Sequence, residues 1–554
     1  MAAAAAPSSS GQDIPAPLVP ILAILASAYR SFASALTRIP GSPIVIRYIE
    51  SSYQNDPWRS ILEVLLVAFA VRTLLKGRTR GDASSKNWVK LREEEIDELV
   101  DEWVPQPLVD EPSDVDKFTL ASVPVINGPN GLRVKLASSG KMVTNLATVD
   151  WTGMIESDKM KQVAIDTLKL YGVGSCGPSG FYGTIDVHTK FEEEVSSFLG
   201  TESAIIYSQA YATISSAIPS FAKRGDIIVA DKGVNFAIHK GLEISRSTIK
   251  WYAHNDMKDL ERVLQNVEKE QKRKGGRLTR RFIISEGVFE NDGMMVDLPK
   301  VMELKRKYKY RLILDESYSF GMIGAHGRGV TEYYSIPAAE VDILIGSMGN
   351  GLGAGGGFCA GSYHVCKHQK INSSASVFSA ALPAMLATTA SSALATIQTQ
   401  PALFTSLQAN ILLFRQILSK IEPIPMSDTP ATSATGLTAS AATPLTGSSP
   451  SKTPNKDAII HIPSHPSSAL IHIFLLNAPG TMEEEERILQ DVVDELLAKS
   501  DVIVTRARRL RGQEAFEPEP SLKVCLSGAL SRKETEKAAK GLKEALIKVC
   551  GKKR

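Results

Sequence analysis

An apolar stretch near the amino end of the chain is the first strong feature of its hydrophobic pattern. Residues 58–75 read WRSILEVLLVAFAVRTLL, with a continuous apolar run over Val64–Val71 and charges only near the ends. As a helix, these 18 residues span about 27 Å, close to the thickness of an endoplasmic-reticulum bilayer. The stretch therefore predicts a single membrane-spanning helix. A buried core helix is the alternative that a run this short leaves open.

The charges on either side of this stretch predict its orientation. The twenty residues after Leu75 contain six Lys or Arg, whereas the twenty before Trp58 contain two. Because basic residues favour the cytosolic side of a membrane, we expect everything after Leu75 to face the cytosol. Farther upstream, apolar residues recur at helical spacing in Leu18–Leu36. That pattern indicates a helix that lies on a membrane surface or against a partner.

Beyond Gly81 short apolar runs alternate with helix-length segments. Amphipathic helices are predicted over 88–107 and 183–199. Strands are predicted at Ala204–Tyr207, Ile227–Ala230, Phe282–Ser285, Leu312–Leu314 and Ile343–Ile345. Such strands, separated by helices, are typical of an α/β protein with a mainly parallel sheet covered on both faces. Ligands bind at the carboxyl ends of the strands in such sheets, so the candidate chemistry is expected there.

The pattern divides the chain into five parts. We expect a tail with an amphipathic segment (1–57), the membrane helix (58–75), a linker with amino-terminal helices (76–165), a large domain (166–395) and a smaller carboxy-terminal α/β domain (396–554). Inside the last part, Ser427–Asp457 is almost wholly Ser, Thr, Ala, Pro and Gly, without an aromatic residue. This segment cannot bury enough apolar area to offset its ordering entropy. It is predicted to be a disordered insertion, with a regulatory phosphorylation loop as the alternative.

Composition narrows the class of protein. The 554 residues carry a net charge of only +3, which argues against a dedicated nucleic-acid binder. The charged fraction of 22% excludes wholesale disorder. Five scattered cysteines form no CxxC pair, which favours a reducing, cytosol-facing compartment. The histidines show no HExxH arrangement, so no metal site is expected.

Two loops in the first half of the large domain are candidate ligand contacts. Tyr171–His188 has five glycines before Ile185. Glycine permits positive φ and close backbone approach, as needed against a ligand or a subunit boundary; a plain glycine-rich turn is the alternative. Tyr207–Thr213 follows a strand and leads into a helix. Ser208 and the free amides there form a candidate phosphate seat.

Two further loops follow strands in the second half of the large domain. In Leu312–Gly329, Asp315 comes directly after an apolar strand. A buried carboxylate there needs a cationic or hydrogen-bonding partner, and the alternative is a helix cap or a structural ion pair. The other loop, Asp342–Gly361, follows a strand and is very rich in glycine.

The order and spacing of these four loops resemble the α-oxoamine synthase family of pyridoxal-phosphate (PLP) enzymes. The resemblance covers about residues 88–541 outside the insertion, and includes the motifs YGVGSCGPSGFYGT, KRGDIIVAD and GGGFCAG. It implies a fold type I PLP-transferase that condenses an amino acid with an acyl-CoA and releases carbon dioxide. It also implies that Asp315 pairs with the pyridine nitrogen and makes the ring an electron sink.

Three positions depart from the family pattern. Asn350 stands where the family has the lysine that binds PLP, Tyr318 where a histidine usually contacts the ring oxygen, and Asn235 where a histidine usually stacks on the ring. A carboxamide cannot form an imine, and residues 332–364 contain no lysine. The resemblance thus implies that this chain holds no PLP covalently. Its vestigial cofactor site would comprise Ser208, Asn235, Asp315, Tyr318 and Asn350.

A lysine-less member of this family implies a heterodimer with a lysine-bearing second subunit that holds the PLP. Because fold type I sites are built at a dimer interface, the resemblance implies that Cys176 and Ser379 complete the partner's site. The alternatives are a small buried residue for Cys176 and a helix N-cap for Ser379. The basic segment Ala507–Gln513 falls where the family has an Arg for the substrate carboxylate, and a solvated basic face is the alternative.

Three functional hypotheses follow. The first is a non-catalytic subunit of an acyltransferase in the endoplasmic-reticulum membrane, single-pass with a cytosolic body, which also binds membrane regulatory proteins. The second is a scaffold or regulator that completes no active site. The third is an independently active synthase with relocated chemistry, which Asn350 disfavours.

Overall fold

The computed structural model describes residues 44, 47–48, 51, 57–75, 91–109, 111–275, 279–422, 458–476, 480–510 and 512–551. They fall into two compact units, Met1–Glu111 and Pro112–Arg554. The five-part division expected from the sequence is finer than this and stays a prediction. The amphipathic segment 18–36 and the insertion 427–457 lie outside the described residues.

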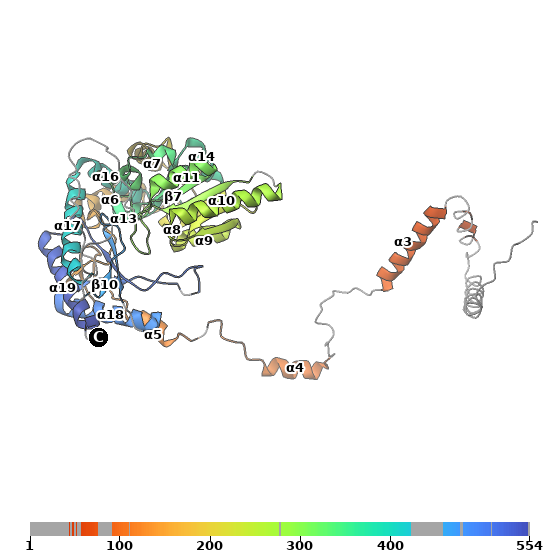
Figure 1. Ribbon diagram of the computed structural model, residues 1–554, viewed down its shortest axis with the longest axis horizontal. Coiled ribbons are helices and arrows are strands. Elements are labelled where there is room, and N and C mark those ends of the chain that lie inside the picture. The colour runs from red at the N-terminus through yellow and green to blue at the C-terminus, as the bar shows by residue number, and fades with distance from the viewer. Residues whose placement is uncertain are drawn as a thin grey trace, which may run out of the picture. The chain divides into compact units, whose positions relative to one another are not determined.

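The first unit contains the helices α3 (Pro57–Leu75) and α4 (Glu93–Glu102) (Figure 1). In the described part of the chain, no helix combines the length and apolar character needed to cross a membrane. The spanning helix predicted at 58–75 is therefore corrected: a helix forms there, but its sequence includes three charged residues, Glu63 and Arg72 among them. Each charge near the centre of a spanning helix costs about 3 kcal/mol. Helix α4 is shorter than the predicted segment 88–107.

A seven-stranded sheet forms the centre of the second unit, with strand order β3-β9-β8-β7-β6-β4-β5. Its strands are β3 (Ser203–Tyr207), β4 (Ile227–Asp231), β5 (Thr248–Tyr252), β6 (Arg281–Glu286), β7 (Arg311–Asp315), β8 (Ile343–Ser347) and β9 (Gly357–Gly361). Strand β9 runs antiparallel to both of its neighbours, and the β8-β7-β6-β4-β5 pairings are parallel. The mainly parallel α/β sheet predicted from the sequence is confirmed.

All five predicted strands occur in this sheet, each extended by one or two residues. The sheet has two further strands, β5 and β9, that the sequence does not predict. Strand β9 comes from GFCAG, inside the glycine-rich stretch expected to be a loop. Glycine fits there because a Cβ on Gly357 would lie 2.4 Å from Thr213 Oγ1. Strand β5 lies at the edge of the sheet, where its partly exposed residues show no continuous apolar run.

Two smaller sheets belong to the carboxy-terminal part. One has the order β10-β11-β14-β13, and the other has the order β1-β2-β12. Their strands are β1 (Arg133–Lys135), β2 (Met142–Asn145), β10 (Ile460–His461), β11 (Leu470–Leu475), β12 (Val502–Ile503), β13 (Thr505–Arg506) and β14 (Leu522–Cys525). Strand β2 pairs in parallel with β12. Residues expected to be linker therefore share a sheet with the carboxy-terminal segment.

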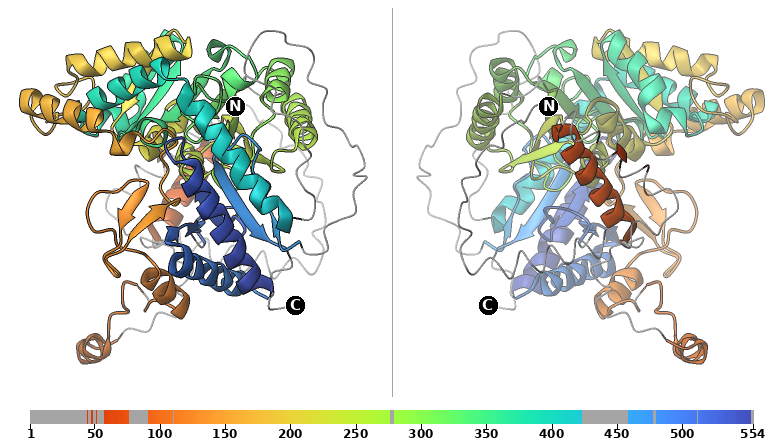
Figure 2. Two further views of the ribbon diagram at one scale, coloured as in Figure 1. Left: turned by 90° about the vertical axis from the view of Figure 1, so that its left-hand side faces the viewer. Right: turned by 90° about the vertical axis from the view of Figure 1, so that its right-hand side faces the viewer.

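Helices surround these sheets. They are α5 (Asp114–Ala121), α6 (Asp158–Tyr171), α7 (Asp186–Leu199), α8 (Ala210–Phe221), α9 (Phe236–Ser245), α10 (Met257–Lys274), α11 (Leu298–Tyr308), α12 (Val330–Tyr333), α13 (Met348–Leu352), α14 (Tyr363–Asn372), α15 (Ser374–Val377), α16 (Ala384–Thr399), α17 (Ala402–Leu418), α18 (Met482–Ser500) and α19 (Arg532–Cys550). Helix α16 packs against α6. Helix α17 packs against α19, and Figure 2 shows this second pair in cyan and dark blue. Short 3-10 turns occur at Met154–Glu156, Ala338–Glu340 and Ser419–Ile421.

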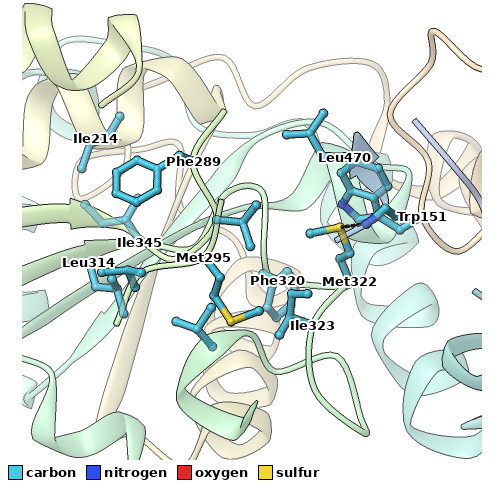
Figure 3. Packing of buried hydrophobic residues seen from close by; sticks show 14 of the residues in the cluster. Trp151, Ile214, Phe289, Met295, Leu314, Phe320, Met322, Ile323, Ile345 and Leu470 are labelled. Atoms are coloured by element: carbon cyan, nitrogen blue, oxygen red, sulfur yellow. Dashed lines mark hydrogen bonds between the residues drawn. The ribbon is translucent and has the colours of Figure 1, made fainter. Parts of the chain in front are cut away.

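One hydrophobic core joins the large sheet to the carboxy-terminal part. Figure 3 shows a portion of it, from Leu314 and Ile345 of the large sheet to Met322 and Leu470. The backbone amide of Ala469 lies 3.1 Å from the Met322 sulfur. The loop after β7 therefore packs directly on the carboxy-terminal sheet, which places that sheet beside the carboxyl ends of the large sheet's strands.

Candidate functional site

The candidate site lies where four neighbouring parallel strands end. Asn235 follows β4, Glu286 ends β6, Asp315 ends β7 and Asn350 follows β8 in helix α13. Glu286 and Asp315 are paired in register across β6 and β7. The sheet thus brings these four residues together. The sequence places Asn235, Asp315 and Asn350 in different loops, and it does not single out Glu286.

Asp315 is buried, with 2% of its surface exposed, and both carboxylate oxygens accept hydrogen bonds. Asn235 Nδ2 donates to Oδ2 at 3.1 Å, and the Ser317 amide donates to Oδ1 at 2.9 Å. Burial raises the pKa of Asp315 above its usual value, and the bonds from Ser317 and Asn235 oppose that shift. The partner that a buried carboxylate requires is here an amide side chain.

Asn235 holds its place through three hydrogen bonds. Its side-chain oxygen accepts from the Ile238 amide at 3.0 Å and caps α9, while its amide group donates to Asp315. Its backbone amide donates to the Glu286 carboxylate. Burial, with the nearby carboxylates of Asp315 and Glu290, raises the pKa of Glu286 well above its usual value. A protonated Glu286 lowers the negative charge that the folded site must bury.

Tyr318 belongs to a second group of polar side chains at this edge. Its hydroxyl donates to Glu290 at 2.6 Å. Lys523 of β14 lies 3.3 Å from the same carboxylate and 5.0 Å from the Tyr318 ring. His472 pairs with Lys523 in register, and burial lowers the pKa of His472 to about 3, so the imidazole is neutral.

Glu286, Glu290, His472 and Lys523 are site residues that sequence reasoning missed. Glu286 and Glu290 follow the predicted strand Phe282–Ser285, just as Asp315 follows a predicted strand. That position after a strand is the sequence signal that could have identified them. Nothing local marks Lys523, because its approach to Tyr318 depends on packing between segments 205 residues apart.

The Asn350 side chain bonds to the turn that follows Asp315. The side-chain Nδ2 of Asn350 donates to the Ser317 carbonyl at 2.7 Å. The backbone carbonyl of Asn350 accepts from the Trp151 backbone amide at 3.3 Å. The side chain therefore ties α13 to the turn that follows Asp315. Ser208 lies between β3 and α8, and two strands, β9 and β8, separate β3 from β7.

These residues do not fit a PLP held covalently by this chain. Asn350 cannot form an imine, and its amide nitrogen is engaged by Ser317. The carboxylate of Asp315, which would face a pyridine nitrogen, already accepts from Asn235 and Ser317. Each oxygen therefore already has one donor from this chain. No chemical step can be assigned to PLP on these residues.

Cys176 and Ser379 lie on two segments that run side by side. Pro178 forms a β-bridge with Ala380, and the Ala381 amide donates to the Gly177 carbonyl at 2.8 Å. Both residues are exposed. The small-buried reading of Cys176 is therefore wrong, as is the N-cap reading of Ser379, since α16 begins after Pro383.

Large apolar side chains surround these two residues on the surface. They include Val173 at 74% exposed, Phe181 at 64%, Tyr182 at 93% and Phe378 at 85%. The backbone at Cys176 is left-handed, with φ of 55°, which a non-glycine residue adopts at a cost. Aromatic surface of this kind is typical of an interaction site.

The basic segment 507–513 forms no hydrogen bond or ion pair with Asp315 among the described residues, and its Gln513 carbonyl accepts a hydrogen bond from Lys240 of α9 at 3.2 Å. Arg509 has a side chain only 2% exposed, and it pairs with Glu486 at 2.8 Å and Glu517 at 3.2 Å. A solvated basic face is therefore the wrong reading for Arg509. The segment lines a cavity of about 410 Å³ between α5, α18 and β13.

Comparison with known proteins gives a consistent family. Residues 141–542 match the model of the aminotransferase class I and II family. The chain is 33% identical to serine palmitoyltransferase 1 of Saccharomyces cerevisiae, over 96% of this chain and 97% of the relative. It is 36% identical to serine palmitoyltransferase 1 of Dictyostelium discoideum, over 82% and 87%.

Solved structures agree on the fold. A Sphingomonas wittichii serine palmitoyltransferase superposes with a TM-score of 0.63 at 20% identity, covering 78% of this chain and 96% of that one. A high-resolution structure of SPT with its PLP internal aldimine gives a TM-score of 0.63 at 18% identity, covering 82% and 96%. The fold type I PLP-transferase expectation is confirmed.

Proposed function

The chain belongs to the serine palmitoyltransferase 1 group of the aminotransferase class I and II family, and from that membership we propose that it is the lysine-less subunit of a heterodimeric serine palmitoyltransferase. Its partner is a lysine-bearing long-chain-base subunit 2 homologue that holds PLP covalently. The complex condenses L-serine with palmitoyl-CoA and releases 3-ketosphinganine, CoA and carbon dioxide.

The pairing of the Cys176 and Ser379 segments is the observation that carries this proposal. Both residues are exposed, on adjacent strands of backbone, inside an apolar surface. In their own chain's candidate site, Asp315 and Asn350 are engaged in internal hydrogen bonds. A surface that carries small polar side chains among aromatic ones suits a subunit that docks on a partner and extends groups into the partner's site.

PLP on the partner supplies the electron sink for decarboxylation and carbon–carbon bond formation. In this chain, we assign to the Ser379 hydroxyl a hydrogen bond to an anionic group of the partner's site. Cys176, held by its left-handed backbone, limits the space beside the amino-acid substrate. The apolar residues near Cys176 and Ser379 exclude water from the interface between the two subunits.

We place the complex on the cytosolic face of the endoplasmic reticulum, with membrane regulatory proteins as further partners. The five cysteines all lie in the described part of the chain and form no disulfide, which suits a reducing compartment. The acyl-CoA substrate and the long-chain product are both amphiphilic, so a membrane-associated site suits their transfer.

Steady-state kinetics of the reconstituted heterodimer test the proposal. Cys176→Ala and Ser379→Ala should each lower kcat or change the choice of amino acid by on the order of 10-fold, as expected for one lost contact in a site. Ser406→Ala on the exposed side of α17 is the matched control and should leave both unchanged.

The second candidate function is a scaffold that completes no active site. Wild-type kinetics in both variants, with the heterodimer intact by gel filtration, would favour the scaffold and reject the proposal. Loss of the heterodimer itself would be seen in the same gel filtration and would separate an assembly defect from a defect in the site.

A further inference from the structure

A row of basic side chains lies at the end of the large sheet opposite the candidate site. Lys223 and Arg224 precede β4, Arg246 precedes β5, and Lys309 precedes β7. All four are exposed. We call these four residues, with Arg280 before β6 and Arg311 at the start of β7, the basic edge.

Strand register places these residues along one line. Ile227 of β4 is paired with Thr248 of β5 and with Arg281 of β6, and Phe282 is paired with Arg311 of β7. The first residues of four adjacent parallel strands are thus level. Neighbouring strands lie about 4.8 Å apart, so the turns before them form an edge about 15 Å long.

Hydrogen bonds join the turns into a continuous surface. The Asp226 carboxylate accepts from the backbone amides of Lys223 and Arg280 at 2.9 and 3.1 Å. The Ser247 hydroxyl donates to the Lys223 carbonyl at 3.1 Å. These bonds fix the backbone of the edge while its long side chains reach into solvent.

The charge of the edge is only partly neutralised. Arg280 pairs with Asp226 at 2.9 Å and Arg311 with Asp342 at 3.4 Å. Among the described residues, Lys223, Arg224, Arg246 and Lys309 form no ion pair within 4.0 Å.

We propose that the basic edge binds the anionic headgroups of a lipid bilayer. The cations stand on successive turns along a line, as binding to a flat charged surface requires. Ile244, 60% exposed, stands beside Arg246 and provides an apolar contact at the interface. The proposal rests on charge and register and is independent of the catalytic role of the complex.

The backbone conformation at Arg246 and Lys309 determines which substitutions can test lipid binding by the basic edge. Arg246 and Lys309 end helices α9 and α11 with positive φ, 54° and 58°. Asparagine tolerates that conformation better than most residues, so Arg246→Asn and Lys309→Asn remove charge without straining the turns. Arg224→Gln completes a triple variant. Arg532→Gln, Lys533→Gln and Lys537→Gln on α19 form the matched control, with the same loss of charge.

Co-sedimentation of the full chain with phosphatidylcholine vesicles, with and without phosphatidylserine, measures the effect. Each cation near an anionic surface strengthens binding about fivefold, so the triple variant should lose on the order of 100-fold of the phosphatidylserine-dependent binding. The control variant should keep it, and high salt should abolish it in the wild type. Turnover in detergent should be unchanged.

Three results would overturn the proposal. One is equal phosphatidylserine-dependent binding by the wild type and the triple variant. Another is an equal loss in the α19 control, which would make net charge the cause. The third is tighter binding of a polyglutamate peptide than of anionic vesicles at equal charge concentration, which would assign the edge to an acidic protein partner.

Discussion

Asn350 and Asn235 act as a pair around Asp315. The sequence predicts that Asn350 cannot bind PLP covalently, because an amide nitrogen is not a nucleophile toward an aldehyde. The structure adds what the two amides do instead: Asn350 holds the Ser317 carbonyl, and Asn235 holds the Asp315 carboxylate. These contacts could not be predicted from the sequence, since they join loops that follow different strands.

Removing Asn235 should destabilise the folded chain. Asn235→Ala leaves one oxygen of buried Asp315 without its donor and removes the cap of α9. These losses cost about 1–3 and about 1 kcal/mol, so the free energy of unfolding should fall by about 2–4 kcal/mol in urea titrations. Asn235→Ser keeps a capping oxygen and should recover part of the loss. An unchanged urea midpoint for Asn235→Ala would contradict this account of Asp315.

Strands are the elements that the hydrophobic pattern predicts best. The five central runs are apolar because both faces of the sheet are covered, so each appears as an uninterrupted stretch. Strand β9 escapes the pattern because close neighbours require glycine there, and β1 and β2 escape because they pair with β12 from the far end of the chain. Length and apolarity predict a spanning helix at 58–75, whereas the three charged residues in α3 disfavour one.

The loop between β7 and α12 contains a carboxylate with a pH-dependent role. Glu316 accepts hydrogen bonds from the Ser319 hydroxyl and from the Val330 and Thr331 amides, which start α12. Burial raises the pKa of Glu316 from 4.5 to about 7, against the opposing effect of these bonds. Between these values the folded chain binds a proton that the unfolded chain has released. The free energy of unfolding therefore falls as pH rises through this window.

Glu316→Gln should remove that pH dependence. The amide stays neutral at every pH, so the stability of the variant relative to wild type should improve by about 3 kcal/mol between about pH 4.5 and about pH 7.5. Urea unfolding of both proteins at the two pH values measures the difference. Loss of an acceptor should weaken the variant equally at both pH values, so only the change with pH tests whether Glu316 titrates. Parallel pH profiles would show that Glu316 does not titrate in this range.

At the scale of the whole molecule, the chain has separate surfaces for separate tasks. The carboxyl ends of the sheet strands, where fold type I enzymes hold PLP, carry the internal network around Asp315 and Asn350. The exposed segments at Cys176 and Ser379 provide the surface that we assign to the partner. The opposite end of the sheet carries the basic edge. Under the proposed function, chemistry in the complex depends on the lysine of the partner.

The absorbance spectrum of the purified chain with PLP, alone and with its lysine-bearing partner, tests this central claim most directly. The account predicts no visible imine band from the chain alone, because Asn350 cannot form the bond and Asp315 is already hydrogen-bonded. The band should be present when the partner is added. A visible imine band from the chain alone, removed by borohydride reduction and mapped to one of its own lysines, would contradict the account.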